Sequence, residues 1–129
     1  MAYTILIVDD SATTRAFIKR TLKLTGIPTD AVLEAGDGKA ALDVVAKNKV
    51  DLVLADLHMP IMNGIEMTRQ LLADEKTKAI PVVVVSADPN TDRLEQLKSE
   101  GVRGIVRKPF TPEALKSALS GLLAEVAHV

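Results

Sequence analysis

Cysteine and tryptophan are absent from the sequence, and aromatic residues make up only 2% of it. Without cysteine the protein has no disulfide bond, no thiolate nucleophile and no cysteine-based metal site, and this composition fits a reducing compartment. With so few aromatic rings, the hydrophobic core must be built from Ile, Leu, Val and Ala. We therefore expect a cytoplasmic protein with an aliphatic core.

Long apolar runs and a strong net charge are also absent. No run approaches the roughly 20 apolar residues that cross a bilayer. The apolar run near the N-terminus follows no basic region and is too short for a signal peptide. The formal net charge is -1, which gives no electrostatic attraction to nucleic acid or to an anionic membrane surface. We therefore expect no membrane insertion and no nucleic-acid partner.

The length and the balance of residue types suit one domain. The chain has 129 residues, of which 47% are hydrophobic and 26% are charged, so it can bury a core and remain soluble. No internal repeat and no low-complexity linker divides it. We expect a single domain over residues 1–129.

Five apolar runs have the length and composition of buried strands. The clearest, Val50–Ala55, stops at Asp56, and Pro60 and the Asn63-Gly64 pair then force a turn. An apolar run bounded by turn residues is typical of a strand buried on both faces of a parallel sheet. The predicted strands are Tyr3–Val8, Ala31–Ala35, Val50–Ala55, Val82–Val85 and Gly104–Val106.

Amphipathic helices are predicted after each strand. In the first, Ile18 and Leu22 with Phe17 and Leu24 form the apolar stripe, and Gly26 ends the helix. We interpret the Lys and Arg residues of the helices as solvated faces. The later stripes are Ala41, Leu42 and Val45; Ile65, Thr68 and Leu72 with Met67 and Leu71 beside them; Leu94 and Leu97; and Leu115, Ala118, Leu119, Leu122 and Val126, after the N-cap Thr111 and Pro112.

This fivefold alternation predicts an α/β fold, a doubly wound five-stranded parallel sheet with helices on both faces and right-handed crossovers. All strands of such a sheet end at one edge, where ligands bind. Polar side chains with matching chemistry follow these strand ends: Asp9, Asp10, Asp56, Ser86 and Lys108.

Three carboxylates at one edge repel one another unless a cation lies between them. An all-oxygen site of this kind suits Mg²⁺ or Mn²⁺. A carboxylate beside a hard cation and the Lys108 ammonium can attack phosphorus, and Ser86 can donate a hydrogen bond to a phosphoryl oxygen. Taken singly, each residue also has an ordinary structural interpretation, as a turn or cap residue or as a solvated lysine. His58 and His128 have no paired histidine nearby, and we assign neither a catalytic role.

The motifs ILIVDD, LVLADLHMPIMNG, VVVVSA and IVRKPF, in this order and spacing, resemble those of response regulator receiver domains, and the whole chain resembles single-domain, CheY-like receivers. The resemblance implies the flavodoxin/CheY-like strand order 2-1-3-4-5. It also implies a two-component phosphorelay in which Asp56 accepts a phosphoryl group from a sensor histidine kinase or a histidine phosphotransfer protein.

The resemblance further implies a role for each site residue. Asp9, Asp10 and Asp56 hold Mg²⁺ together with the backbone carbonyl of His58. Ser86 is the switch hydroxyl, and Lys108 contacts the phosphoryl group. The peptide bond between Lys108 and Pro109 is expected to be cis.

The output surface implied by the family consists of the fourth helix, the fifth strand and the fifth helix. Its usual aromatic switch position is Ile105 here, and an aliphatic side chain cannot swing as a ring does. No DNA-binding segment follows the receiver, so we expect output through contact with a downstream protein or through phosphorelay, without turnover of an external substrate.

Two other interpretations remain open. An Mg²⁺-dependent phosphatase with an Asp nucleophile usually carries a second acid two residues later, but this position is His58. A receiver-fold interaction module without phosphorylation would not need the acids, Ser86 and Lys108 together. Hydrolysis of a generic phosphomonoester would favour the phosphatase, and failure to bind Mg²⁺ would favour the module.

Overall fold

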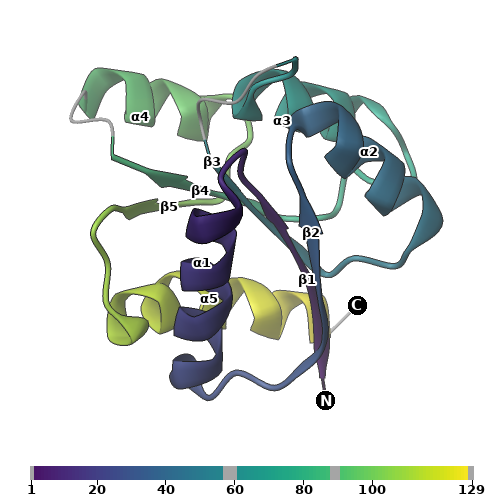
Figure 1. Cartoon of the computed structure of the whole chain (residues 1–129). Helices are drawn as coiled ribbons and strands as arrows, with labels where there is room; N and C mark the ends of the chain where they lie inside the picture. Colours follow the sequence, from purple (N-terminus) through teal and green to yellow (C-terminus); the bar gives the residue numbers. More distant parts are fainter. Residues whose placement is uncertain (1, 57–60, 88–90, 128–129) are drawn as a thin grey trace.

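The computed structural model describes residues 2–56, 61–87 and 91–127 of the chain. These residues form one five-stranded parallel sheet in the order β2-β1-β3-β4-β5 (Figure 1). Both the predicted fold class and the strand order implied by the resemblance are confirmed. The strands are β1 (Tyr3–Val8), β2 (Thr29–Ala35), β3 (Leu52–Asp56), β4 (Val82–Ser86) and β5 (Gly104–Arg107).

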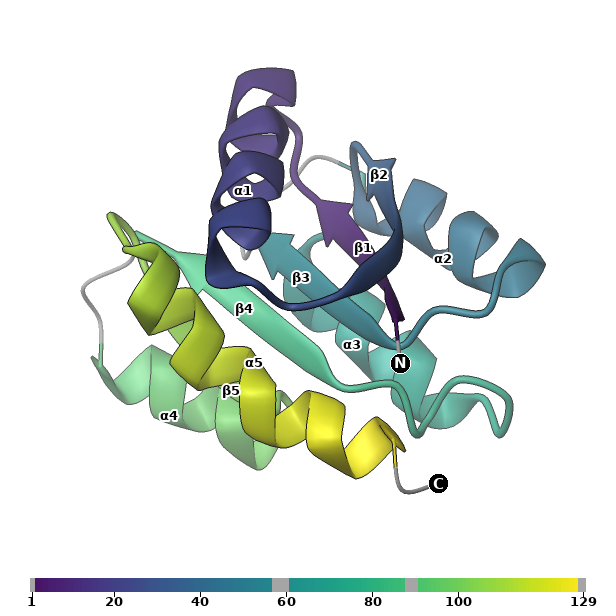
Figure 2. The ribbon, with the colours of Figure 1, turned by 90° about the horizontal axis from the view of Figure 1, so that it is seen from below.

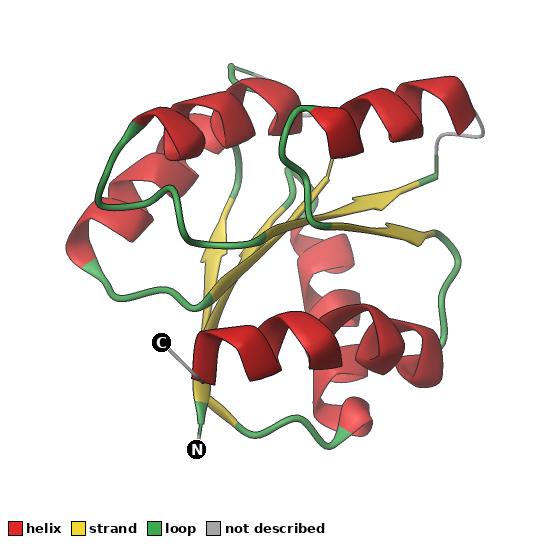
Figure 3. Ribbon diagram, turned by 180° about the vertical axis from the view of Figure 1, so that it is seen from behind, coloured by secondary structure: helices red, strands yellow, loops and turns green. Residues whose placement is uncertain are grey.

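The helices cover both faces of the sheet. One face carries α1 and α5, which contact each other, and the other face carries the remaining three helices (Figures 1, 2 and 3). Within the described part of the chain, no helix has both the length and the apolar character needed to cross a membrane. The helices are α1 (Ala12–Thr25), α2 (Gly38–Lys47), α3 (Gly64–Ala73), α4 (Thr91–Ser99) and α5 (Pro112–Ala127).

The central strand β1 is buried on both faces. Ile5 and Ile7 contribute to the core under α1 and α5, whereas Leu6 and Val8 contribute to the core under α2 and α3. Each fully buried Ile or Leu side chain stabilises the fold by about 1.5–3 kcal/mol relative to its exposed state. The two aliphatic layers therefore fix the position of the residues that follow β1.

Polar caps start the helices at the carboxyl edge of the sheet. A side-chain oxygen of each N-cap residue accepts a hydrogen bond from a backbone N–H of the first turn, which satisfies a donor that has no partner inside the helix. The predicted N-cap at Thr111 and the left-handed C-cap at Gly26, with φ of 79°, are both confirmed. The other N-cap residues are Ser11, Asp37 and Asn63.

The predicted buried faces of two helices are partly wrong. Phe17 and Leu24 of α1 are 49% and 67% exposed, and Leu72 of α3 is 39% exposed. In α3, Met67 and Leu71 face the core, and the predicted Thr68 is also buried. Neighbouring apolar residues allow two stripes about one position apart, so the contact with the sheet decides which stripe is buried.

The acid inside the Val50–Ala55 run has a structural role. The Thr4 N–H donates to Asp51 Oδ2 at 2.8 Å, and the Asp51 N–H donates to the Thr4 carbonyl at 2.8 Å. These bonds join β1 to the residue before β3 at the amino edge of the sheet. Asp51 therefore lies at the opposite end from Asp56, and the strand begins at Leu52.

Ile61 has a left-handed backbone, with φ of 66°, and its side chain is 77% exposed. This conformation costs an L-residue roughly 1–2 kcal/mol, whereas Asn tolerates it. We expect Ile61→Asn to raise the free energy of unfolding by about 0.5–1 kcal/mol, measured as a higher urea midpoint at unchanged slope. Ile61→Val, which keeps the β-branch, is the matched control. Equal urea midpoints for the Asn and Val variants would contradict backbone strain at Ile61.

Candidate functional site

The position of Asp9 follows from the pairing of β1 on both of its edges. Val8 is the register partner of Ala35 in β2 and of Ala55 in β3. Asp9, one residue further, therefore lies level with Asp56, the last residue of β3. The Asp9 N–H continues the ladder and donates to the Ala35 carbonyl at 3.1 Å.

Three carboxylates meet at this edge of the sheet. Asp9, Asp10 and Asp56 each offer an oxygen, and these atoms lie within 4.8 Å of one another. Asp9 is 2% exposed, Asp56 is half-buried and Asp10 is exposed. Parallel strand ends bring together the acids that were predicted to share an edge, and their oxygens are close enough for one cation to contact all three.

The two carboxylate oxygens of Asp9 have different environments. Oδ1 accepts a hydrogen bond from the Ser11 N–H at 2.8 Å. Oδ2 is buried and has no hydrogen-bond partner, although Lys108 Nζ lies 3.6 Å away. A buried carboxylate oxygen without a hydrogen bond is costly. It is also the atom that a bound cation would satisfy.

Burial raises the pKa of Asp9, and the nearby charges of Asp56 and Asp10 raise it further. The hydrogen bond from the Ser11 N–H and the Lys108 ammonium act in the opposite direction but do not cancel the rise. The charged form of Asp9 is thus disfavoured in the protein without a cation. An all-oxygen donor set with surplus negative charge fits a hard divalent cation.

Ser86 and Lys108 lie at the same edge, on the side of β4 and β5. Ser86 ends β4 and is 1% exposed, and its backbone carbonyl accepts a hydrogen bond from the Lys108 N–H at 2.9 Å. The peptide bond between Lys108 and Pro109 is cis, as the resemblance implied. The structure therefore places both residues at the edge that carries the acids.

The structure leaves the roles of two predicted site residues untested. His58, whose backbone carbonyl is the expected fourth ligand, lies outside the described residues, as does His128. Ile105 of β5 is half-buried and packs against a small cluster that includes Leu97 of α4. The expected roles of both His58 and Ile105 therefore stay predictions.

The sequence interpretation missed Arg15. The helix pattern predicts that the cationic residues are solvated, but the Arg15 side chain is only 19% exposed, and its Nη1 donates to the backbone carbonyl of Asp9. Its Nε donates to Glu34 Oε1 at 3.0 Å. A usable signal was present, because Glu34 is the one polar residue in the predicted strand Ala31–Ala35.

Comparisons with known proteins show the family to which the chain is similar. The family model described as the response regulator receiver domain matches residues 5–120. The chemotaxis protein CheY of Pseudomonas aeruginosa is 38% identical over 122 residues, which cover 95% of this chain and 97% of that protein. A chemotaxis protein CheY homolog of Campylobacter jejuni is 38% identical over 120 residues, which cover 92% of this chain and 91% of that protein.

Solved structures show the same architecture. The chemotaxis response regulator CheY4 of Vibrio cholerae is similar with a TM-score of 0.82 and 29% identity, over 95% of this chain and 99% of that one. A response regulator receiver domain protein from Clostridium thermocellum is similar with a TM-score of 0.85 and 25% identity, over 99% of this chain and 98% of that one.

The raised pKa of Asp9 gives stability a defined pH dependence. The folded protein holds the Asp9 proton to a higher pH than the unfolded chain does. Without divalent cations, the contribution of Asp9 to stability is therefore lost as the pH rises from the ordinary aspartate value, near 4, through the raised one. We expect Asp9→Asn to increase the free energy of unfolding at pH 7 by about 1–3 kcal/mol, because the neutral amide removes a buried charge that Asp56 and Asp10 repel. Urea unfolding in a chelator at several pH values measures the difference.

The control is Asp43→Asn, which removes an exposed carboxylate of α2 far from the cluster. The free energy of unfolding of this variant at pH 7 should be close to that of the native protein, because the Asp43 side chain is exposed. The contradicting result is a constant difference between the free energies of unfolding of the native protein and Asp9→Asn from pH 4 to pH 7. That result would show that Asp9 ionises as readily in the folded state as in the unfolded chain.

Proposed function

The chain belongs to the response regulator receiver domain family and is a two-component response regulator, and on this premise we propose that residues 1–129 form a single receiver domain switched by phosphorylation of Asp56. The observation that carries the proposal is the meeting of Asp9, Asp10 and Asp56 beside Lys108, with one buried Asp9 oxygen unpaired. Members of this family are signalling switches and do not turn over an external substrate as classical enzymes do.

Asp56 is the phosphoacceptor in this proposal. A carboxylate oxygen of Asp56 attacks the phosphorus of a phosphohistidine on a sensor histidine kinase or a histidine phosphotransfer protein. The new O–P bond forms an acyl phosphate, the P–N bond breaks, and the imidazole leaves and takes a proton from solvent. Asp56 is half-buried at a strand end, so a donor can reach it from the edge of the sheet.

The three carboxylates hold Mg²⁺, with the backbone carbonyl of His58 as a further ligand implied by the family. Bound Mg²⁺ supplies positive charge that offsets the repulsion among the carboxylates and the phosphoryl oxygens. Asp9 contributes the oxygen that has no other partner, and its neighbour Asp10 approaches from the solvent side. The chain itself contributes the geometry of this donor set.

Lys108 and Ser86 recognise the phosphoryl group. Lys108 Nζ lies 3.6 Å from Asp9 Oδ2, too far for a hydrogen bond, so it can exchange Asp9 for a phosphoryl oxygen at little cost. The Ser86 hydroxyl donates a second hydrogen bond to the phosphoryl group. Both residues belong to the strand ends that lead toward α4 and α5.

The output is a change in the surface made by α4, β5 and α5. Ile105 packs against the cluster of Val84, Leu97 and Val102, which joins β4 and β5 to α4. Because Leu97 of α4 belongs to this cluster, a shift of α4 would change its packing against Ile105, so no aromatic ring has to swing. A downstream protein that prefers one arrangement reads the signal. As its relatives are chemotaxis proteins, we propose a chemotaxis-type pathway in the cytoplasm.

Acetyl phosphate, a small phosphoryl donor, tests the proposal. We expect the purified protein to gain the mass of one phosphoryl group in the presence of Mg²⁺ and to gain none without it. Asp56→Asn should remove the gain completely, because the nucleophile is lost. Asp51→Asn, which changes a carboxylate at the amino edge of the sheet, should keep it. Intact mass spectrometry is the measurement.

Two results would reject the switch. If the folded native protein gains no phosphoryl group, whether or not it binds Mg²⁺, it is a receiver-fold interaction module. If it continuously hydrolyses p-nitrophenyl phosphate, it is a phosphatase. Unfolding curves show whether each variant is folded. If a folded variant gains no phosphoryl mass, the chemistry has been lost and not the structure.

A further inference from the structure

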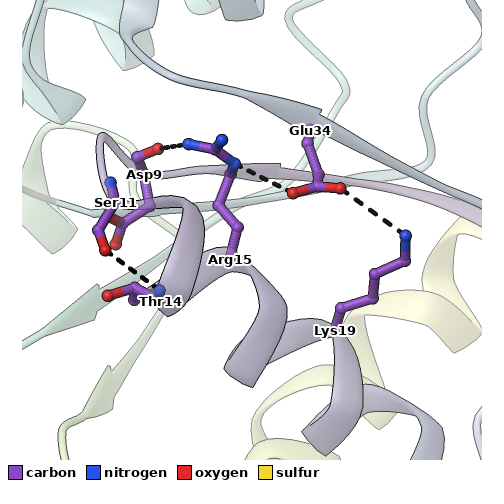
Figure 4. Close-up of polar contacts among 6 residues, drawn as sticks. All are labelled: Asp9, Ser11, Thr14, Arg15, Lys19 and Glu34. Carbon is purple, nitrogen blue, oxygen red and sulfur yellow. Dashed lines mark hydrogen bonds and ion pairs between the residues drawn. The ribbon is translucent and has the colours of Figure 1, made fainter.

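Arg15, near the start of α1, connects three elements at the site (Figure 4). Its Nε donates to Glu34 Oε1 on β2 at 3.0 Å, and its Nη1 donates to the main-chain carbonyl of Asp9 after β1. Lys19, one helical turn further along α1, places its Nζ 3.7 Å from Glu34 Oε2. The guanidinium is thus held by a carboxylate on one side and holds the backbone of Asp9 on the other.

The Asp9 backbone is fixed on both sides. Its N–H donates to the Ala35 carbonyl, and its carbonyl accepts from Arg15. Its Oδ1 accepts from the Ser11 N–H, which leaves only Oδ2 without a hydrogen bond. Since every other polar atom of Asp9 is held, the direction of Oδ2 is set by these three bonds.

The carbonyl that Arg15 holds belongs to the peptide bond between Asp9 and Asp10. The plane of this peptide links the Cα atoms of two of the three clustered acids. A rotation of the plane would turn Asp9 and Asp10 relative to each other. Without Arg15 the carbonyl would also lack its donor at a residue that is 2% exposed.

From this geometry we propose that Arg15 is a positioning residue for the cation site: by holding the Asp9–Asp10 peptide plane, it sets the relative directions of the two carboxylates. The inference rests on the proposed function, because it assumes that these carboxylates bind Mg²⁺. Glu34 neutralises the guanidinium, so Arg15 serves as a hydrogen-bond donor without adding net positive charge beside the cation. Its planar fork suits it to hold two oxygens at once.

A positioning role and a charge role predict opposite results. Removal of a positive charge near a cation site would strengthen cation binding by simple electrostatics. Removal of a positioning hydrogen bond should weaken it. Mg²⁺ demands near-ideal octahedral geometry, whereas Ca²⁺ accepts irregular sites. A positioning defect should therefore reduce Mg²⁺ affinity more than Ca²⁺ affinity, and a charge effect should change both by a similar factor.

The test compares Arg15→Met with Lys19→Met. Both variants lose a cation that pairs with Glu34, and both keep an apolar stem, but only Arg15 touches Asp9. Affinities come from the rise in urea midpoint with Mg²⁺ or Ca²⁺ concentration, a measurement that also reports folding. We expect Arg15→Met to bind Mg²⁺ about 10-fold more weakly, with a smaller loss for Ca²⁺. Lys19→Met should bind both ions as the native protein does.

Unchanged or tighter Mg²⁺ binding by folded Arg15→Met would overturn the proposal, as would an equal loss for the two ions. If Arg15→Met does not fold, Arg15→Lys takes its place, because it keeps the positive charge but loses the planar fork that holds both oxygens. This variant should also weaken Mg²⁺ binding, and unchanged binding would overturn the proposal. Absence of Mg²⁺ binding by the native protein would instead reject the proposed function itself.

Discussion

The pairing of β1 on both edges and its burial on both faces is the constraint on which the site depends. β2 and β3 flank it, and aliphatic layers cover it above and below, so its carboxyl end cannot shift relative to either neighbour. Asp9 directly follows β1, so its position is fixed as well. The ladder bond to Ala35 and the register with β3 then decide which side chains Asp9 meets.

At this fixed position the site carries uncompensated negative charge. Asp9 is buried next to two other carboxylates, with a raised pKa and one unpaired oxygen, while Lys108 lies just beyond hydrogen-bond distance. An arrangement optimised for stability would pair these groups fully or replace them with apolar ones. The surplus negative charge of the three carboxylates is therefore the feature that a divalent cation would offset.

Much of the fold was predictable because the chain repeats a simple pattern. Five aliphatic runs separated by amphipathic segments allow few topologies, and the carboxyl ends of parallel strands must share an edge. This rule alone brought Asp9, Asp56 and Ser86 to one edge. The strand order came only from family resemblance. Val-rich and Ile-rich strands of similar length and composition do not specify which strand pairs with which.

The sequence by itself determined the local structure: the aliphatic strands, the caps Gly26 and Thr111, and the acids at strand ends. These follow from side-chain chemistry over a few neighbouring residues. Only the tertiary structure decided which helix faces are buried, and that Arg15 turns away from solvent to hold the Asp9 carbonyl beside Glu34. Such contacts join residues of different elements. Their energies depend on how α1 settles against β2, and this is fixed by the packing of the whole sheet.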